Sequence, residues 1–197
     1  MFKLGLTGSI GMGKSATAAM FRAAGVPVHD ADAVVHALYR GRAAPLIGAA
    51  FPGAVEDGVV DRARLSKVLF EDESRLRALE RIVHPLVREE RDTFFAAHAR
   101  APIVVLDIPL LFETGGEAGT DAVALVTAPE PVQSARVLSR AGMTEEKFRA
   151  ILAKQMPDSE KRRRAHFLIE TGFGFGYAER RVRAVLRAIA GRSGRTE

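Results

Sequence analysis

The sequence predicts an α/β fold in which a mostly parallel sheet is flanked by helices. Short apolar runs alternate with segments whose apolar residues recur at helical spacing, and this alternation is typical of such a fold. A glycine-rich segment at residues 8–15 joins the first apolar run to the first helical segment. With 197 residues, the chain is long enough for one domain with a substantial core and an inserted subdomain.

The glycine-rich segment reads Gly-Ser-Ile-Gly-Met-Gly-Lys-Ser and matches G-x-x-x-x-G-K-S/T, the phosphate-binding loop of P-loop NTPases. Glycines let the backbone curl so that successive N–H groups face phosphate oxygens, and the following helix adds its dipole. In this pattern Lys14 contacts the β- and γ-phosphates of ATP, and the Ser15 hydroxyl binds Mg²⁺. We expect the nucleotide to be bound by Thr7, Gly8, Ser9, Ile10, Gly11, Met12, Gly13, Lys14, Ser15 and Ala16.

The first hundred residues contain two predicted strands and a long helical region. In chain order we expect a strand at 2–7, a helix at 16–24, a strand at 25–30 and a helix at 33–39. Turn-forming residues stand at 41–45, 51–53 and 57–58, and apolar residues recur at helical spacing from 61 onward. Pro85 should start a new helix after a bend, because the residue before a proline disfavours helical geometry. We interpret residues 33–100 as a helical insertion that binds the second substrate.

The second half returns to alternating strands and helices. We expect strands at 103–107, 122–127 and 166–170, and helices at 133–141, 144–156 and 178–190, with Thr144 as an N-cap. Residues 1–32, 101–131 and 165–191 would form the nucleotide-binding core, and residues 132–160 a lid. The basic run from Lys161 to Arg164 is expected to be solvated surface.

Three aspartates lie at or just after the ends of predicted strands, at the sheet edge where parallel α/β proteins bind ligands. We expect Asp32 to orient the acceptor hydroxyl or take its proton, and to hold a metal-bound water. Asp30 is expected to cap the helix that follows it. Asp107 lies where many P-loop proteins place a metal-orienting acid, and hydrogen bonding to the local backbone is an equally open alternative.

Basic side chains supply the remaining candidates. Arg136 and Arg140 are four residues apart, so we expect them on one face of a lid helix that clamps phosphates, although an exposed helix face would also carry arginines. His84 is expected to meet an anionic substrate or to cap the bend before Pro85.

Composition excludes several classes of protein. The chain has no cysteine, no apolar run as long as a membrane span, and a predicted strand already at Leu4, so we expect no signal peptide and a cytoplasmic location. The net charge is +5, and basic residues gather after residue 160, including a tail beyond Gly191. Nucleic-acid binding is nevertheless disfavoured, because no recognisable motif for it appears. A GTP switch is disfavoured because no N-K-x-D stretch is present. The oligomeric state stays open.

Over nearly its whole length the chain resembles the dephospho-coenzyme A kinase family. The resemblance rests on segments in family order and spacing: Leu6–Ser15, Asp30-Ala31-Asp32, His84-Pro85, Pro109-Leu110-Leu111-Phe112-Glu113, Gln133 with Arg136 and Arg140, and Gln155. It implies a five-stranded parallel core, a helical coenzyme A-binding region and a lid. It also implies transfer of the γ-phosphate of ATP to the ribose 3′-hydroxyl of dephospho-coenzyme A, the last step of coenzyme A synthesis. Another nucleotide or metabolite kinase of the same fold is the alternative.

The resemblance also implies roles for single residues. Asp32 would be the base, while Thr7, Lys14 and Ser15 would serve nucleotide and metal. Arg136 and Arg140 would be lid residues, and acceptor-side residues would be His84, Pro109, Leu110, Leu111 and Glu113. The chain departs from the family near the last strand, where Ala165-His166 and Glu170-Thr171-Gly172 stand in place of Ala-Asp and Asp-Asn-Gly. In that segment, backbone groups rather than side chains would contact the adenine.

Overall fold

The computed structural model describes residues 1–70, 72–192 and 194. The chain divides into two compact units, residues 1–29 with 98–197 (the core unit) and residues 30–97 (the helical unit). The predicted basic tail beyond Gly191 falls mostly outside the described residues. None of the helices in the described part of the chain has the length and apolar character that a membrane crossing requires.

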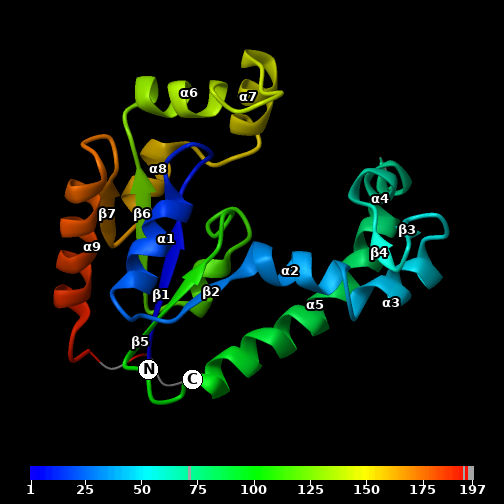
Figure 1. Cartoon of the computed structure of the whole chain (residues 1–197), viewed down its shortest axis with the longest axis horizontal. Coiled ribbons are helices and arrows are strands. Elements are labelled where there is room, and N and C mark those ends of the chain that lie inside the picture. The colour runs from blue at the N-terminus through cyan, green and yellow to red at the C-terminus, as the bar shows by residue number, and fades with distance from the viewer. Residues whose placement is uncertain (71, 193, 195–197) are drawn as a thin grey trace. The chain divides into compact units, whose positions relative to one another are not determined.

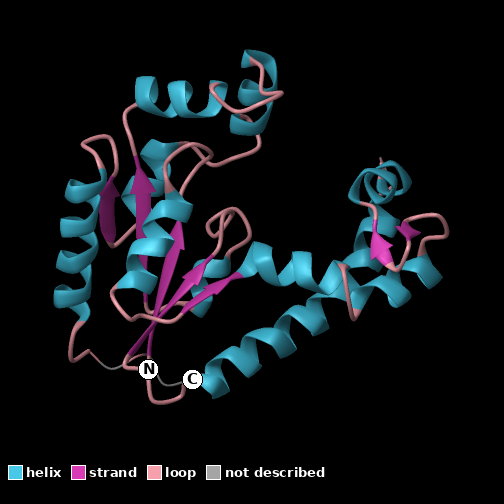
Figure 2. Ribbon diagram, viewed as in Figure 1, coloured by secondary structure: helices cyan, strands magenta, loops and turns pink. Residues whose placement is uncertain are grey.

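A five-stranded sheet forms the centre of the core unit (Figures 1 and 2). Its strands are β1 (Phe2–Thr7), β2 (Val28–Asp30), β5 (Ile103–Asp107), β6 (Ala122–Thr127) and β7 (Phe167–Glu170), in the order β2-β5-β1-β6-β7. Central β1 pairs in parallel with β5 on one side and β6 on the other, and β7 runs parallel to β6. The carboxyl ends of these strands therefore share one edge, and the phosphate loop begins at that edge. The predicted α/β fold with a parallel sheet is confirmed.

Helices cover the sheet because each buries an apolar stripe on it. The helices of the core unit are α1 (Lys14–Ala23), α6 (Glu130–Leu138), α7 (Glu145–Leu152), α8 (Asp158–Arg164) and α9 (Phe175–Ile189), with a short 3₁₀ helix η1 (Gly116–Gly119). Figure 1 shows α9 running beside β7, and α1 packs against α9. Phe21 of α1 and Val182 of α9 meet Leu4 and Leu6 of β1 in one apolar cluster.

The helical unit has an apolar core of its own. It contains α2 (Ala31–Tyr39), α3 (Ala43–Ala50), a two-stranded hairpin of β3 (Val55–Glu56) and β4 (Val59–Val60), α4 (Arg62–Leu69) and α5 (Glu73–Ala97). Leu38, Ile47 and Leu65 are buried there with Leu79 and Val83 of α5. A 68-residue segment that builds its own core can be treated as one structural unit.

Two predictions about this unit are wrong. Residues 51–53 and 57–58 form turns as predicted, but residues 43–45, predicted as part of a turn, begin α3. The helix tolerates Pro45 because the proline lies in its first turn, where a missing N–H breaks no intrahelical bond. Pro85 does not start a new helix either, since α5 continues through it. Leu79, Val83 and Leu86 keep one face of α5 buried on both sides of the proline, and this packing offsets the lost hydrogen bond.

Candidate functional site

The phosphate loop joins β1 directly to α1. Gly11 and Gly13 have φ values of 78° and 91°, a left-handed conformation that strongly favours glycine. A side chain at Gly11 would also come within 2.5 Å of the Val137 side chain. Backbone conformation therefore favours glycine at both positions, and close packing against Val137 requires it at Gly11. The strand–loop–helix context expected for a phosphate loop is present.

Lys14 and Asp107 meet at the edge of the sheet. Lys14 is the first residue of α1, and its Nζ lies 2.5 Å from Oδ1 of Asp107 at the end of β5. The side chain of Asp107 is only 3% exposed. The strand register explains the meeting, because Leu6 of β1 stands opposite Asp107 in the parallel pair. Of the two roles predicted for Asp107, the ion pair with Lys14 favours a place in the phosphate site.

Two glutamines form hydrogen bonds with the backbone of Ile10 in the phosphate loop. The Ile10 N–H donates to Oε1 of Gln155 at 3.2 Å, and Nε2 of Gln133 donates to the Ile10 carbonyl at 2.7 Å. Gln133 lies on α6, and Gln155 follows α7. Both backbone groups of Ile10 are therefore bound to the predicted lid segment. Sequence reasoning included both glutamines in the family pattern and assigned them no role.

Arg136 contacts the loop after β7. Its Nη1 donates to Oγ1 of Thr171 at 2.8 Å and its Nη2 to the Thr171 carbonyl at 2.9 Å. Nη1 also lies 3.5 Å from the Gly11 carbonyl. Arg140 is exposed and lies beyond Leu138, the last residue of α6. The prediction that one helix face carries both arginines is therefore wrong, because α6 ends two residues earlier.

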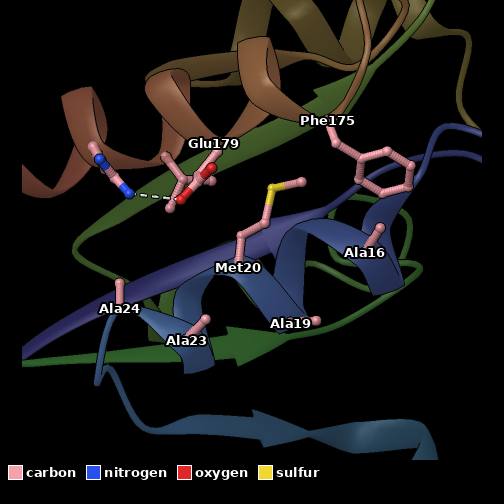
Figure 3. A pocket seen from close by; sticks show the side chains of 9 residues that line it. Ala16, Ala19, Met20, Ala23, Ala24, Phe175 and Glu179 are labelled. Carbon is pink, nitrogen blue, oxygen red and sulfur yellow. Dashed lines mark hydrogen bonds and ion pairs between the residues drawn. The ribbon is translucent and has the colours of Figure 1, made fainter.

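Two neighbouring pockets lie along α1, and the smaller one reaches the phosphate loop. One of about 200 Å³ is lined by Gly13, Ala16, Thr17, Met20, Arg136, Thr171, Gly174, Phe175 and Ala178. The other, of about 540 Å³, lies between α1 and α9 and shares Ala16, Met20 and Phe175 with the first (Figure 3). Figure 3 shows Met20 pointing from α1 towards α9 and the Phe175 ring near Ala16, while Glu179 pairs with Arg183 on α9. The smaller pocket adjoins Gly13, the left-handed glycine before Lys14, and most of its lining side chains are apolar.

The segment after β5 packs inward more than its sequence predicts. Leu111 and Phe112 are buried in a cluster with Val123, so the Leu111 side chain, predicted to contact substrate, belongs to the core. Pro109 is partly buried, and its carbonyl accepts a hydrogen bond of 3.0 Å from the hydroxyl of buried Thr7. Leu110 remains 41% exposed. Thr7 thus fixes the start of this segment to the end of β1.

Glu113 forms a buried ion pair instead of an open acceptor site. Its Oε1 accepts from the Met156 N–H at 2.9 Å and lies 2.8 Å from Nζ of Lys161, which is fully buried on α8. The prediction that Lys161 is solvated surface is wrong. Burial is the largest influence on the pKa of Glu113 and raises it, but the Lys161 ammonium and the backbone N–H groups outweigh this, so the pKa lies below 4.5.

The remaining candidates lie in the helical unit. Asp30 precedes α2, and its Oδ1 accepts from the Ala33 N–H at 2.9 Å, which confirms the predicted N-cap. Asp32 lies in the first turn of α2 and is exposed. His84 is exposed on α5, and because the helix continues through Pro85 there is no helix end at this point for His84 to cap. The catalytic role of Asp32 and the substrate role of His84 stay predictions.

Comparisons with known proteins agree on one family. The dephospho-CoA kinase family model matches residues 2–173. A dephospho-CoA kinase of Mesorhizobium japonicum is 59% identical over 196 residues, which are 98% of this chain and 100% of the relative. The crystal structure of TT1252 from Thermus thermophilus is 40% identical with a TM-score of 0.83, covering 96% of this chain and 98% of that one. The dephospho-CoA kinase of Campylobacter jejuni, 21% identical with a TM-score of 0.62 and coverages of 95% and 96%, shares the fold. The chain therefore belongs to the dephospho-CoA kinase family.

Proposed function

We propose that the chain transfers the γ-phosphoryl group of ATP to the ribose 3′-hydroxyl of dephospho-coenzyme A. The observation that carries the proposal is the phosphate loop itself, with Gly11 and Gly13 in the left-handed conformation and Lys14 beside Asp107, in a chain of this family. Phosphoryl transfer depends on positioning and on charge stabilisation rather than on covalent chemistry. A loop that cradles phosphates and a lysine at its end supply both.

Mg²⁺ would bind beside the phosphates through oxygen ligands. The Ser15 hydroxyl and the Asp107 carboxylate are hard oxygen donors, and they fit this ion. Mg²⁺ usually keeps several water ligands and binds phosphate oxygens, so one or two protein oxygens are enough to hold it beside the nucleotide. When bound, the ion neutralises charge on the phosphates, and Ser15 with Asp107 would orient it.

Acceptor binding is assigned to the helical unit. In this proposal Asp32 orients the 3′-hydroxyl and takes its proton, and exposed His84 contacts an anionic part of the acceptor. Pro109 and exposed Leu110 would also contact the acceptor, whereas the Glu113 carboxylate is already paired with Lys161. Arg140 is exposed and free to approach phosphates when the lid moves.

A phosphoryl-acceptor screen tests this proposal against another small-molecule kinase of the same fold. The protein would be incubated with ATP and Mg²⁺ and, separately, with dephospho-coenzyme A, nucleoside monophosphates and small sugars. We expect ADP release to be stimulated strongly by dephospho-coenzyme A alone. Preferential phosphorylation of a nucleotide or a sugar would overturn the assignment of the acceptor and leave the phosphate site intact.

A further inference from the structure

Thr171 lies where three parts of the nucleotide site meet. It is the first residue after β7 and is only 7% exposed. Its N–H donates to the Thr127 carbonyl at the end of β6 at 2.9 Å. Its hydroxyl donates to the Met12 carbonyl in the phosphate loop at 2.8 Å and accepts from Nη1 of Arg136 at 2.8 Å. One side chain thus connects the sheet, the loop and the predicted lid.

The contact with Met12 determines where a backbone amide of the loop points. No cis peptide bond is present in the described chain, and in a trans peptide unit the C=O and N–H groups point in opposite directions. Because Thr171 binds the Met12 carbonyl, the Gly13 N–H of the same peptide unit points away from Thr171. Inward-facing amides of this motif meet phosphate oxygens, so an amide held away from Thr171 is available to the phosphates.

The contact is close and leaves little freedom. A Cβ on Gly13 would lie 3.2 Å from Oγ1 of Thr171, so the loop packs directly on this hydroxyl. The Thr171 hydroxyl can donate only one hydrogen bond. The Met12 carbonyl at 2.8 Å accepts it in preference to the Thr127 carbonyl at 3.3 Å. The Met12 peptide unit is therefore held in one orientation.

The contact with Arg136 fixes a planar cation. Its two terminal nitrogens bind the hydroxyl and the carbonyl of the same residue, so the guanidinium cannot rotate freely. Arg136, Thr171 and Gly13 line the same pocket of about 200 Å³. Thr171 therefore holds a positive charge at the wall of the pocket beside the phosphate loop.

We propose that Thr171 is a positioning residue for the phosphoryl donor. Its hydroxyl aims the Gly13 N–H at the phosphates and holds the Arg136 guanidinium at the nucleotide pocket, without touching the reacting atoms. This inference rests on the proposed function, because it takes the phosphate loop to bind ATP. It concerns only the donor, so the identity of the acceptor does not affect it.

The test uses two pairs of side chains that differ at the hydroxyl. Thr171→Val removes it at nearly constant shape, and Thr171→Ser and Thr171→Ala differ from one another by that group alone. Thr120→Val is the control, because Thr120 is similarly buried and its hydroxyl donates to the Glu117 carbonyl at 2.9 Å in the loop before β6. Thermal unfolding identifies the variants that fold, and calorimetry with ATP and Mg²⁺ measures donor affinity.

We expect Thr171→Val and Thr171→Ala to weaken ATP binding and to slow single-turnover transfer, together by about 10-fold to 100-fold in catalytic efficiency for ATP, as for a lost hydrogen bond to a charged group. Thr171→Ser and Thr120→Val should behave like the parent. In an Arg136→Ala background, Thr171→Val should cost less than it does in the parent, because part of its effect passes through Arg136.

Two results would overturn the proposal. The first is a folded Thr171→Val protein with the ATP affinity and transfer rate of the parent. The second is equal impairment of the Ser and Ala variants, since the methyl group rather than the hydroxyl would then matter. Failure of the parent to phosphorylate dephospho-coenzyme A would overturn only the acceptor assignment, and the ATP affinities of the variants would still decide the role of Thr171.

Discussion

Lys14 is aimed at the phosphate site by the backbone and by one buried carboxylate. The left-handed Gly13 delivers it to the first position of α1, and Asp107 holds its ammonium at 2.5 Å. Asp107 is almost completely buried, so the ion pair serves the fold as well as the site. Removing Lys14 should therefore have two separable consequences, one for catalysis and one for stability.

The Lys14→Ala variant should lose turnover by at least about 10²-fold, because it lacks a charge that stabilises the transition state. It should also be less stable by about 3 kcal/mol, because Asp107 loses its cation in a buried place. Adding Asp107→Asn should recover much of the stability and none of the turnover. Steady-state kinetics and thermal unfolding of the single and double variants measure the two effects. Near-parent turnover in Lys14→Ala would contradict the assignment of the loop.

The two aspartates beside α2 form a matched pair for testing the acceptor base. Asp30→Asn should cost about 1 kcal/mol or less, since asparagine also caps helices, and should leave transfer intact. Asp32→Asn should slow single-turnover transfer by roughly 10²–10⁴-fold while acceptor affinity stays close to that of the parent. Transfer that is abolished by Asp30→Asn and preserved by Asp32→Asn would show that the base was assigned to the wrong aspartate.

At the scale of elements, α8 is attached to the segment after β5 by one buried ion pair. Lys161 of α8 is fully buried against Glu113, and the same carboxylate accepts from the Met156 N–H just before α8. Arg164 pairs with Glu117 of η1, and Arg162 lies 3.6 Å from Glu170 at the end of β7. The path back from the predicted lid to the sheet is thus fixed by charge as well as by packing.

Replacing only Lys161 of the buried Lys161–Glu113 pair should destabilise the protein more than replacing both residues. Lys161→Met should destabilise the protein by about 3 kcal/mol, because Glu113 is left without its cation. Lys161→Met combined with Glu113→Leu should recover most of that loss, since no buried charge remains. Chemical unfolding of both variants provides the comparison. Equal stability of the single and double variants would mean that water satisfies Glu113 without Lys161.

The same pair predicts a pH dependence. The pKa of Glu113 lies below 4.5 in the folded protein, so the unfolded chain takes up a proton at higher pH than the folded chain does. The stabilisation from Glu113 is therefore fully present above pH 4.5 and is lost as the pH falls below it. The stability difference between the parent and Glu113→Gln, measured from about pH 7 down to about pH 3, should shrink on the acid side. A stability difference that grows on acidification would mean that folding raises the pKa of Glu113 instead of lowering it.

Elements that depend on local patterns could be predicted, and contacts between distant segments could not. Strand β6 has the predicted bounds because its apolar run is buried along its whole length, and Thr144 caps α7 as expected by accepting from the Lys147 N–H. Helix α8 was not predicted, because its run of four basic residues has no apolar stripe and looks like solvated surface. Only the position of Glu113 beside Lys161 explains why Lys161 is buried. In the site, Lys14 and Asp107 lie together because the parallel strands β1 and β5 end at the same edge of the sheet. The Thr171–Met12 contact joins residues 159 apart and has no local signal.

At the scale of the whole molecule, the chain builds two apolar cores. Leu4, Phe21 and Val126 belong to the core unit, and Ile47 and Leu79 belong to the helical unit. All residues of the phosphate loop lie in the first unit, and Asp32 and His84 lie in the second. A unit with its own core has its own local opening free energy, so a ligand bound to one unit should protect that unit most.

Hydrogen exchange with each ligand alone should therefore separate donor from acceptor. ADP with Mg²⁺ should slow amide exchange chiefly in α1 and in the loop after β7, because binding lowers the population of open states in the unit that holds the phosphates. Dephospho-coenzyme A should slow exchange chiefly in residues 30–97, with α2 and α5 the most affected. Lys14→Ala is the control for the first ligand, since its loss of phosphate charge should abolish protection by ADP and leave protection by the acceptor unchanged. If dephospho-coenzyme A protects only the core unit, the helical unit does not bind the acceptor, and Asp32 loses its proposed role.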